Sequence, residues 1–540
     1  MELDRFTPRR RRVLQGLMLM AGASVLPRPA MAQELGKKGG TLTVAVPYDL
    51  DTLNTFSTGF LADIQSVVVE GLIAPDENTH YFPVLATEVP TLENGGIVLS
   101  PDGSKMDITF KLREGVLWSD GQPFTSDDVK FTWEAIKDPK FTGESKEGVT
   151  EIDSIETPDP LTAIVHFNTV TPVWPSGFFS RGILPKHALE GKDLNTDPYN
   201  DKPLGTGPFV ITEFKRGQYV IADRNPNYWR KDANGVQLPY IDRMVFNLTP
   251  DASAMVTRLR SGEIMLAYNI PYGQAQALSS SFDIVVNKIL SWQHLDFNFK
   301  GPAPLADVNV RRAFAHAINK DTIVKALNGY PFVVNSVISP QFDYYDPDIK
   351  TYPYDPEAAK KLLDDAGYVM GADGVRAKDG QQLAFNITVQ AGTSQDETAE
   401  QIIMANMKAV GVKLTADNKN GVAFRDARYK GLYDMLYARW ITAADPAYSV
   451  FFGSKGANNG QGYADPKMDA LLDQAEHTID RAKLKAIFKD IQALIADQVV
   501  SIPTTCNVSL IAKTAQLKNF VPNPTNRTIF NNTSSWYLET

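Results

Sequence analysis

The chain of 540 residues contains one cysteine, Cys506, and only six histidines. A single cysteine excludes an intramolecular disulfide and any metal cluster held by several thiolates. The histidines are scattered, and no two of them have the spacing of metal ligands. They are His80, His166, His187, His294, His316 and His477. These residues give little support to a metal centre, and none to a bound cofactor.

Positive charge is also scarce, because 54 basic residues face 63 acidic ones for a net charge of −9. An acidic chain of this kind is a poor partner for nucleic acid. After residue 32, no apolar run approaches the roughly 20 residues that cross a bilayer as a helix. The remaining composition, 43% hydrophobic and 22% charged, is that of a folded globular protein. Its length predicts about three compact lobes.

Residues 1–32 have the features of an export signal. Four consecutive arginines from Arg9 precede an apolar stretch from Val13 to Leu26, and Ala30-Met31-Ala32 forms an A-x-A cleavage site. Residues 10–14 fit the twin-arginine pattern, and the alternative is an ordinary secretory signal with a basic start. No cysteine lies near the cleavage site. We therefore expect an exported, soluble protein of the bacterial periplasm, without a lipid anchor.

The pattern of hydrophobic residues changes near residue 300. Before that point, short alternating segments predict strands at 40–46, 106–112, 163–167 and 217–224. After it, predicted helices at 355–366, 395–410 and 465–497 alternate with predicted strands at 384–389, 413–416 and 433–437. Asp355, Pro356 and Gly367 are typical of the start and end of the first of these helices. The pattern predicts an α/β fold with a partly parallel sheet.

Four blocks of sequence resemble the signatures of the family 5 extracellular solute-binding proteins, the peptide, nickel and oligosaccharide class of ABC-importer receptors. The blocks lie at 110–129 (with FKLREGVLWSDG at 110–121), at 205–209 with 225–229, at 295–298 with 310–320, and at 354–363. They occur in the family's order. The resemblance extends over about residues 40–520, nearly the whole chain after the export signal.

The resemblance implies a two-lobed periplasmic binding protein with a cleft, two hinge strands and an extra subdomain on the first lobe. We expect lobe one at 33–295, with the subdomain at about 70–200. Lobe two is then expected at 296–501, and a return segment at 502–540 completes lobe one. A ligand between the lobes would shift a hinge equilibrium towards a closed form.

The function that the resemblance implies is that of a monomeric, non-catalytic receptor. It would deliver a small polar solute, whether peptide-like, opine-like or an oligosaccharide, to the permease of an ABC importer. The alternative is a receptor for a metal or a metal chelate of the nickel type. An enzyme is disfavoured because the sequence contains no G-x-S-x-G, H-E-x-x-H, P-loop or G-x-G-x-x-G motif.

Residues 437–446 align with the family's ligand-recognition strand and loop. In peptide-binding members, a Trp there is followed three positions later by an Asp that pairs with the α-amino group. Here Trp440 is followed by Ala443, and a buried ammonium without a partner is costly. This departure favours ligands with hydroxyl-rich or carboxylate-bearing ends. Asp445 replaces the missing acid only if the loop shifts by two residues, and its Asp-Pro context favours a helix cap instead.

Six residues are candidates for the ligand site. We expect Trp440 to stack on a sugar ring or side chain, and Arg439 to pair with a carboxylate. Neighbours on a strand point to opposite faces, so both reach the cleft only if the strand bends. Beside Asp445, the other candidates are Trp292 and His294, which share one face near the expected hinge, and Tyr48 at the end of the first strand. For Trp292 and His294, core or hinge packing is the alternative.

Overall fold

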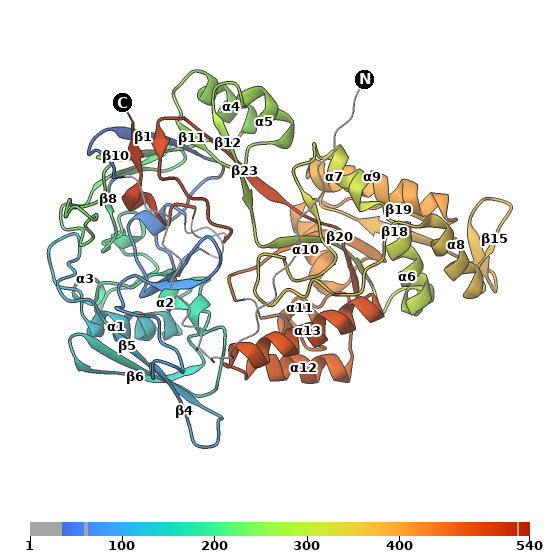
Figure 1. The fold of residues 1–540 in the computed structure, drawn as a ribbon, viewed down its shortest axis with the longest axis horizontal. Helices are drawn as coiled ribbons and strands as arrows, with labels where there is room; N and C mark the ends of the chain where they lie inside the picture. Colours follow the sequence, from blue (N-terminus) through green and yellow to red (C-terminus); the bar gives the residue numbers. More distant parts are fainter. Residues whose placement is uncertain (1–34, 59–62, 446, 526–528, 540) are drawn as a thin grey trace, which may run out of the picture. The chain divides into compact units, whose positions relative to one another are not determined.

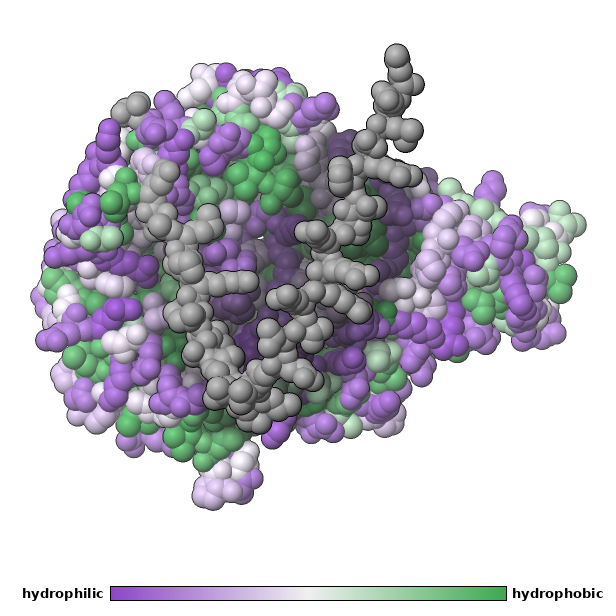
Figure 2. Space-filling view, in the orientation of Figure 1, coloured by the Kyte–Doolittle hydropathy of each residue, from purple (hydrophilic) through white to green (hydrophobic). Residues whose placement is uncertain are grey.

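The structure is a computed structural model that describes residues 35–540, except 59–62, 446, 526–528 and 540. The predicted export signal at 1–32 therefore lies outside the described residues. Three main sheets with flanking helices make up the described part of the chain (Figure 1). Nowhere in that part is a helix both long and apolar enough to cross a membrane. Hydrophilic side chains are spread over the face shown in Figure 2, with hydrophobic ones scattered among them.

The first sheet has seven strands and takes residues from both ends of the chain. Its strand β1 runs parallel to β10 and β11, while the remaining neighbours are antiparallel. The order is β12 (Asp283–Lys288), β23 (Val508–Lys513), β11 (Leu266–Ala267), β1 (Thr41–Val46), β10 (Arg243–Leu248), β9 (Tyr219–Arg224) and β8 (Phe209–Lys215). Helices α4 (Ala252–Arg260) and α5 (Tyr272–Leu278) follow β10 and β11.

A separate four-stranded antiparallel sheet forms the subdomain inserted after β1. Its order is β4 (Ile97–Leu99), β5 (Met106–Lys111), β7 (Thr162–Phe167) and β6 (Ile152–Asp159), and α1 (Ser126–Lys137) contacts β6 and β7. Helix α1 begins where the Thr125 backbone N–H donates to Asp128 Oδ2 at 2.9 Å. Alternate residues of β5, among them Phe110, are buried against an aromatic core with Phe167 and Phe179. The subdomain thus has a hydrophobic core of its own.

The third sheet has five strands and mixes parallel and antiparallel pairs, which confirms the predicted α/β class. Its order is β19 (Lys413–Ala416), β18 (Ala384–Thr388), β20 (Met435–Ile441), β13 (Ser291–Phe297) and β21 (Ser501–Pro503). The helices around it include α6 (Val308–Ala317), α8 (Pro356–Asp365), α9 (Ser394–Ala409) and α10 (Gly421–Lys430).

The predicted helical stretch at 465–497 is two helices rather than one. They are α12 (Pro466–Glu476) and α13 (Arg481–Gln498). The Asp480 carboxylate accepts hydrogen bonds from the backbone N–H groups of Ala482 and Lys483, so it caps a new helix start. A continuous apolar pattern hid this break.

The chain crosses between the first and third sheets twice. β12 ends at Lys288 and β13 begins at Ser291, while β22 (Thr505–Cys506) is followed by β23 at Val508. From here on, lobe one means 35–288 and 508–539, and lobe two means 291–506. The boundary predicted after residue 295 falls inside β13, because β13 pairs with β20 from Ser291 onward.

Candidate ligand-binding cleft

A cavity of about 550 Å³ lies beside the two crossings and is lined by both lobes. Small-molecule sites in proteins typically measure about 300–1,000 Å³. Lobe one contributes Tyr48, Asp63, Tyr268 and Asn287, the crossings contribute Ile289 and Asn507, and lobe two contributes Ser394, Gln395, Arg439 and Ile441. Polar side chains thus stand on both sides of the cleft, among apolar ones, and this suits a solute with polar groups. We call this cavity the cleft.

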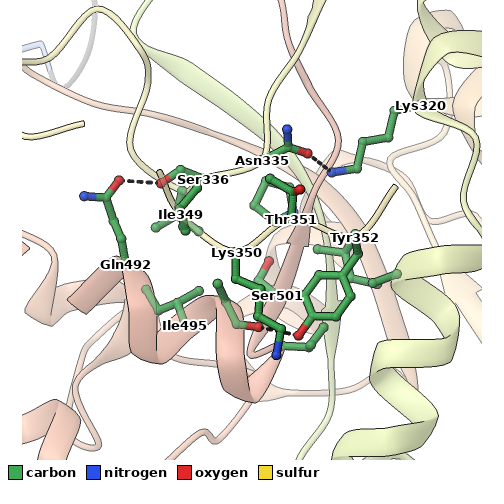
Figure 3. A pocket seen from close by; sticks show the side chains of 16 residues that line it. Lys320, Asn335, Ser336, Ile349, Lys350, Thr351, Tyr352, Gln492, Ile495 and Ser501 are labelled. Carbon is green, nitrogen blue, oxygen red and sulfur yellow. Dashed lines mark hydrogen bonds between the residues drawn. The ribbon is translucent and has the colours of Figure 1, made fainter. Parts of the chain in front are cut away.

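A second cavity lies within lobe two and differs from the cleft in size and lining (Figure 3). It measures about 20 Å³, which is room for a single water molecule. Lys320 Nζ donates to Asn335 Oδ1 at 2.8 Å, and Ser336 Oγ donates to Gln492 Oε1 at 2.8 Å. Burial lowers the pKa of Lys320 to about 7. These side chains satisfy one another, and the space is too small for a solute.

The pairing of β13 with β20 decides which candidate residues face the cleft. Trp292 lies opposite Trp440, and Gln293 lies opposite Arg439. Directly opposed residues share a face of the sheet, and successive residues alternate between faces. Arg439 and Ile441 line the cleft. Trp440 therefore lies on the other face, together with Trp292.

Trp440 packs inside lobe two rather than against the cleft. Its ring stacks on His294 with centroids 6.3 Å apart and an interplanar angle of 7°, and lies 4.6 Å from the ring of Phe451. The Arg428 guanidinium carbon is 3.3 Å from the indole centroid, in a cation–π contact. Trp440 does not line the cleft, so the structure gives no support to the expectation that its ring stacks on the ligand.

Trp292 and His294 are core residues in the structure, which corresponds to the packing alternative. Trp292 is 1% exposed and stacks on Tyr448 with centroids 6.0 Å apart. His294 is also 1% exposed, and its Nδ1 lies 2.9 Å from Asp296 Oδ1. Neither residue lines the cleft. The sequence placed them correctly on one shared face, but that face is turned away from the cleft.

Arg439 is the cation that lines the cleft. Its side chain is exposed, and within the described residues no hydrogen bond or ion pair engages its guanidinium. Its backbone carbonyl accepts from Arg428 Nη2 at 2.8 Å. The nearby Asp396 carboxylate accepts a hydrogen bond from Gln293 instead. Burial raises the pKa of Asp396, and the positive charge of Arg439 opposes that shift.

Tyr48 lines the lobe-one side of the cleft and belongs to a hydrogen-bonded group. Tyr48 OH donates to Asp63 Oδ2 at 2.8 Å, and Tyr268 OH donates to Tyr48 OH at 3.0 Å. Tyr48 and Tyr268 meet because β1 and β11 are parallel neighbours, so the segments after them emerge at one edge of the sheet. Burial raises the pKa of Asp63 to about 6, against the effect of the tyrosine hydrogen bonds.

Asp445 lies away from the cleft, in a cavity of about 20 Å³ that also includes Val173 of lobe one. Burial raises the pKa of Asp445 to about 6, and a hydrogen bond from Tyr81 of lobe one opposes the shift. The residue does not cap a helix, because the N-cap of the following helix α11 (Ser449–Phe452) is Tyr448. Asp445 instead joins the two lobes at a second point.

Sequence reasoning missed several residues of the cleft. Asp63 and Tyr268 belong to segments with no strong pattern, and Gln395 and Asn507 look like ordinary polar positions. One feature of the sequence could have pointed to Asn507, because the residue lies in the segment that was expected to return to lobe one. Its side chain is 3% exposed, and its Nδ2 donates to Gln395 Oε1 at 3.4 Å. Among the residues that the structure describes, no three His, Cys, Asp or Glu side chains form a group fit for a metal ion.

Two lobes joined by two crossing strands, with a cavity lined from both, define the class of two-lobed solute-binding proteins. Comparison with known proteins agrees. Residues 81–462 match the family described as bacterial extracellular solute-binding proteins, family 5. The chain belongs to this family. Its members are solute-binding proteins of transport systems, among them peptide- and nickel-binding proteins of ABC transporters.

Three relatives illustrate the likeness. The oligopeptide-binding protein AppA of Bacillus subtilis is 26% identical over 85% of this chain and 85% of its own. The nickel-binding periplasmic protein of Escherichia coli is 24% identical over 93% of this chain and 94% of its own. The crystal structure of NikZ from Campylobacter jejuni in complex with Ni(L-His) is 27% identical, with a TM-score of 0.75, and covers 92% of this chain and 99% of that chain.

Proposed function

We propose that this protein captures a small polar solute in the cleft by closing its lobes around it, and delivers that solute to the membrane subunits of an ABC importer. The observation that carries the proposal is a cavity of about 550 Å³ lined from both lobes and from both crossings. Binding there would hold the lobes together, because each lobe supplies part of the contact surface.

Contacts between the lobes away from the cleft support closure as the working motion. Tyr81 of lobe one donates to Asp445 of lobe two. His80 Nε2, next to Tyr81, lies 3.7 Å from Asp343 Oδ1, and Asp343 also pairs with Arg481 Nη2 at 2.7 Å. His80 lies in the turn between β2 (Ile73–Pro75) and β3 (Tyr81–Pro83), and Tyr81 is the first residue of β3. This turn and the loop after β20 meet only if the lobes approach each other.

The family and the predicted export signal together suggest the wider setting. We propose that the protein acts as a monomer in the periplasm, without a lipid anchor and without turning over its solute. A peptide-like, opine-like or oligosaccharide solute is the first candidate. A nickel complex is the second, because NikZ in its complex with Ni(L-His) is similar in both sequence and structure.

Native mass spectrometry of the protein purified from the periplasm tests the proposal. We expect a retained small molecule, a smaller radius of gyration in solution scattering when it is bound, and a higher melting temperature. Metal analysis of the same preparation decides between an organic solute and a nickel complex. Absence of any retained or added solute that binds would contradict the receptor role, and release of a chemically altered solute would indicate an enzyme.

A further inference from the structure

The two charged residues that line the cleft differ in whether they have a partner. Among its described lining residues, Arg439 is the one cation and Asp63 the one carboxylate. Asp63 already accepts a hydrogen bond from Tyr48 and is 4% exposed. Arg439 is exposed and has neither a hydrogen bond nor an ion pair with its guanidinium in the described chain. The charged group without a partner in the cleft is therefore the positive one, Arg439.

Asp396 is the acid that would otherwise neutralise Arg439, and its surroundings argue against that role. Its carboxylate is held by the amide of Gln293, which lies directly opposite Arg439 on β13. Burial raises the pKa of Asp396, and the positive charge of Arg439 opposes that shift without a direct contact between the two groups. No ion pair joins the Asp396 carboxylate to Arg439 in the structure. Asp396 thus orders the neighbourhood of Arg439 and leaves the guanidinium open towards the cleft.

Two further features of the same wall suit an oxyanion with a hydrogen-bond donor beside it. Ser394 and Gln395, in the first turn of the 16-residue helix α9, line the cleft with Arg439. Backbone N–H groups in a first helical turn favour an anion, in addition to the charge of Arg439. The buried Oδ1 of Asn507 has no hydrogen-bond partner among the described residues, so it can accept from a ligand hydroxyl or amine.

We propose that the solute carries a carboxylate, that Arg439 binds this carboxylate through two parallel hydrogen bonds, and that Asn507 accepts from a hydroxyl or amine next to it. This inference rests on the proposed function. An arginine fork matches the two oxygens of a carboxylate, and such pairs are stronger than neutral hydrogen bonds. The rest of the solute then faces the tyrosine hydroxyls and the amides of lobe one. Neutral polar groups on the solute can form hydrogen bonds with these side chains.

The test uses the full-length protein and a bacterial culture extract split by anion exchange into an acidic fraction and a neutral-plus-basic fraction, at about pH 11, where amines are uncharged and a solute with an amine and a carboxylate is retained as an anion. Melting temperature is measured against increasing amounts of each fraction. We expect the acidic fraction to stabilise the protein and to protect Arg439 from modification by phenylglyoxal, as read by peptide mass. Methyl esterification of the acidic fraction should abolish both effects, because an ester offers no charge to the guanidinium.

Variants make the assignment specific to Arg439. Loss of a charge-assisted bidentate pair should raise the half-saturating amount of the acidic fraction by about 10- to 100-fold in Arg439→Gln. Arg439→Lys keeps the positive charge but not the two parallel donors. Its half-saturating amount should lie between those of the unaltered protein and Arg439→Gln. Arg243→Gln is the matched control, since Arg243 is a half-exposed strand arginine that pairs with Asp223 outside the cleft.

The outcomes separate the two proposals. Stabilisation that survives methyl esterification, or an Arg439→Gln variant that responds as the unaltered protein does, would overturn the carboxylate inference while leaving the receptor role intact. Stabilisation by neither fraction would contradict the receptor role itself, and the inference would fall with it. Circular dichroism and unfolding of Arg439→Gln verify that it folds, which an exposed side chain predicts.

Discussion

Arg439 and Trp440 are adjacent in β20, and their side chains lie on opposite faces of the lobe-two sheet. Arg439 faces the cleft, whereas Trp440 stacks on His294 inside the lobe. The aromatic residue that the sequence suggested as a ligand platform therefore packs against the core of lobe two. The charged residue beside it is the one that meets the solute in our proposal.

Trp440→Ala should destabilise lobe two. The substitution removes the stack on His294 and leaves the Arg428 guanidinium without its aromatic partner. Since Trp440 is only partly buried, we expect a loss of about 1–3 kcal/mol in the free energy of unfolding, below the range for a fully buried Trp. Chemical denaturation measures it. Trp440→Phe should recover part of this loss. If Trp440→Ala instead weakens solute binding and leaves the stability unchanged, Trp440 contacts the solute.

Asp63→Asn should remove a pH dependence of stability. Burial raises the pKa of Asp63 in the folded protein to about 6 from 3.8. The contribution of this group to the free energy of unfolding is therefore fully present below about pH 4 and is lost as pH rises through 6. The side chain is 4% exposed, and the difference corresponds to about 3 kcal/mol between pH 4 and pH 7. Urea unfolding of both proteins across this range provides the measurement. If the free energy of unfolding of the two proteins changes with pH in the same way, the raised pKa of Asp63 is contradicted.

Tyr81→Phe should weaken the contact between the lobes. Without the Tyr81 hydroxyl, the Asp445 carboxylate loses the donor that comes from lobe one. An unsatisfied buried acceptor costs about 1–3 kcal/mol, so the closed form and the solute affinity should both decline. Solution scattering and calorimetry report the two effects. Tyr219→Phe serves as the control, because Tyr219 bonds to Glu213 within lobe one, and equal behaviour of the two variants would refute a specific role for Tyr81.

Replacement of Arg10 and Arg11 by Lys should stop export. These residues lie outside the described residues, so the expectation comes from the sequence pattern alone. Twin-arginine recognition requires both guanidinium groups, and the precursor should then accumulate in the cytoplasm. Immunoblots of cytoplasmic and periplasmic fractions measure this. Undiminished periplasmic protein would assign the segment to the general secretory route.

Local signals in the sequence were sufficient for the class of the fold and for several of its elements. Helix α8 begins at Pro356 behind the cap Asp355, as predicted, because capping and helix-start geometry involve residues close together in the chain. Strand β19 occupies Lys413–Ala416, which are the predicted bounds. The family blocks likewise consist of contiguous residues, so they were readable without any structure.

Only the tertiary structure decided which of those residues meet in the cleft. Period-two alternation showed that Arg439 and Trp440 point to opposite faces, but the packing of Phe451 and His294 against Trp440 determines which face is interior. Tyr48 and Tyr268 come together through the parallel pairing of β1 with β11, and Asp445 meets Tyr81 across two lobes. Contacts between distant segments depend on how sheets and lobes pack, and a single sequence does not encode that in any local pattern.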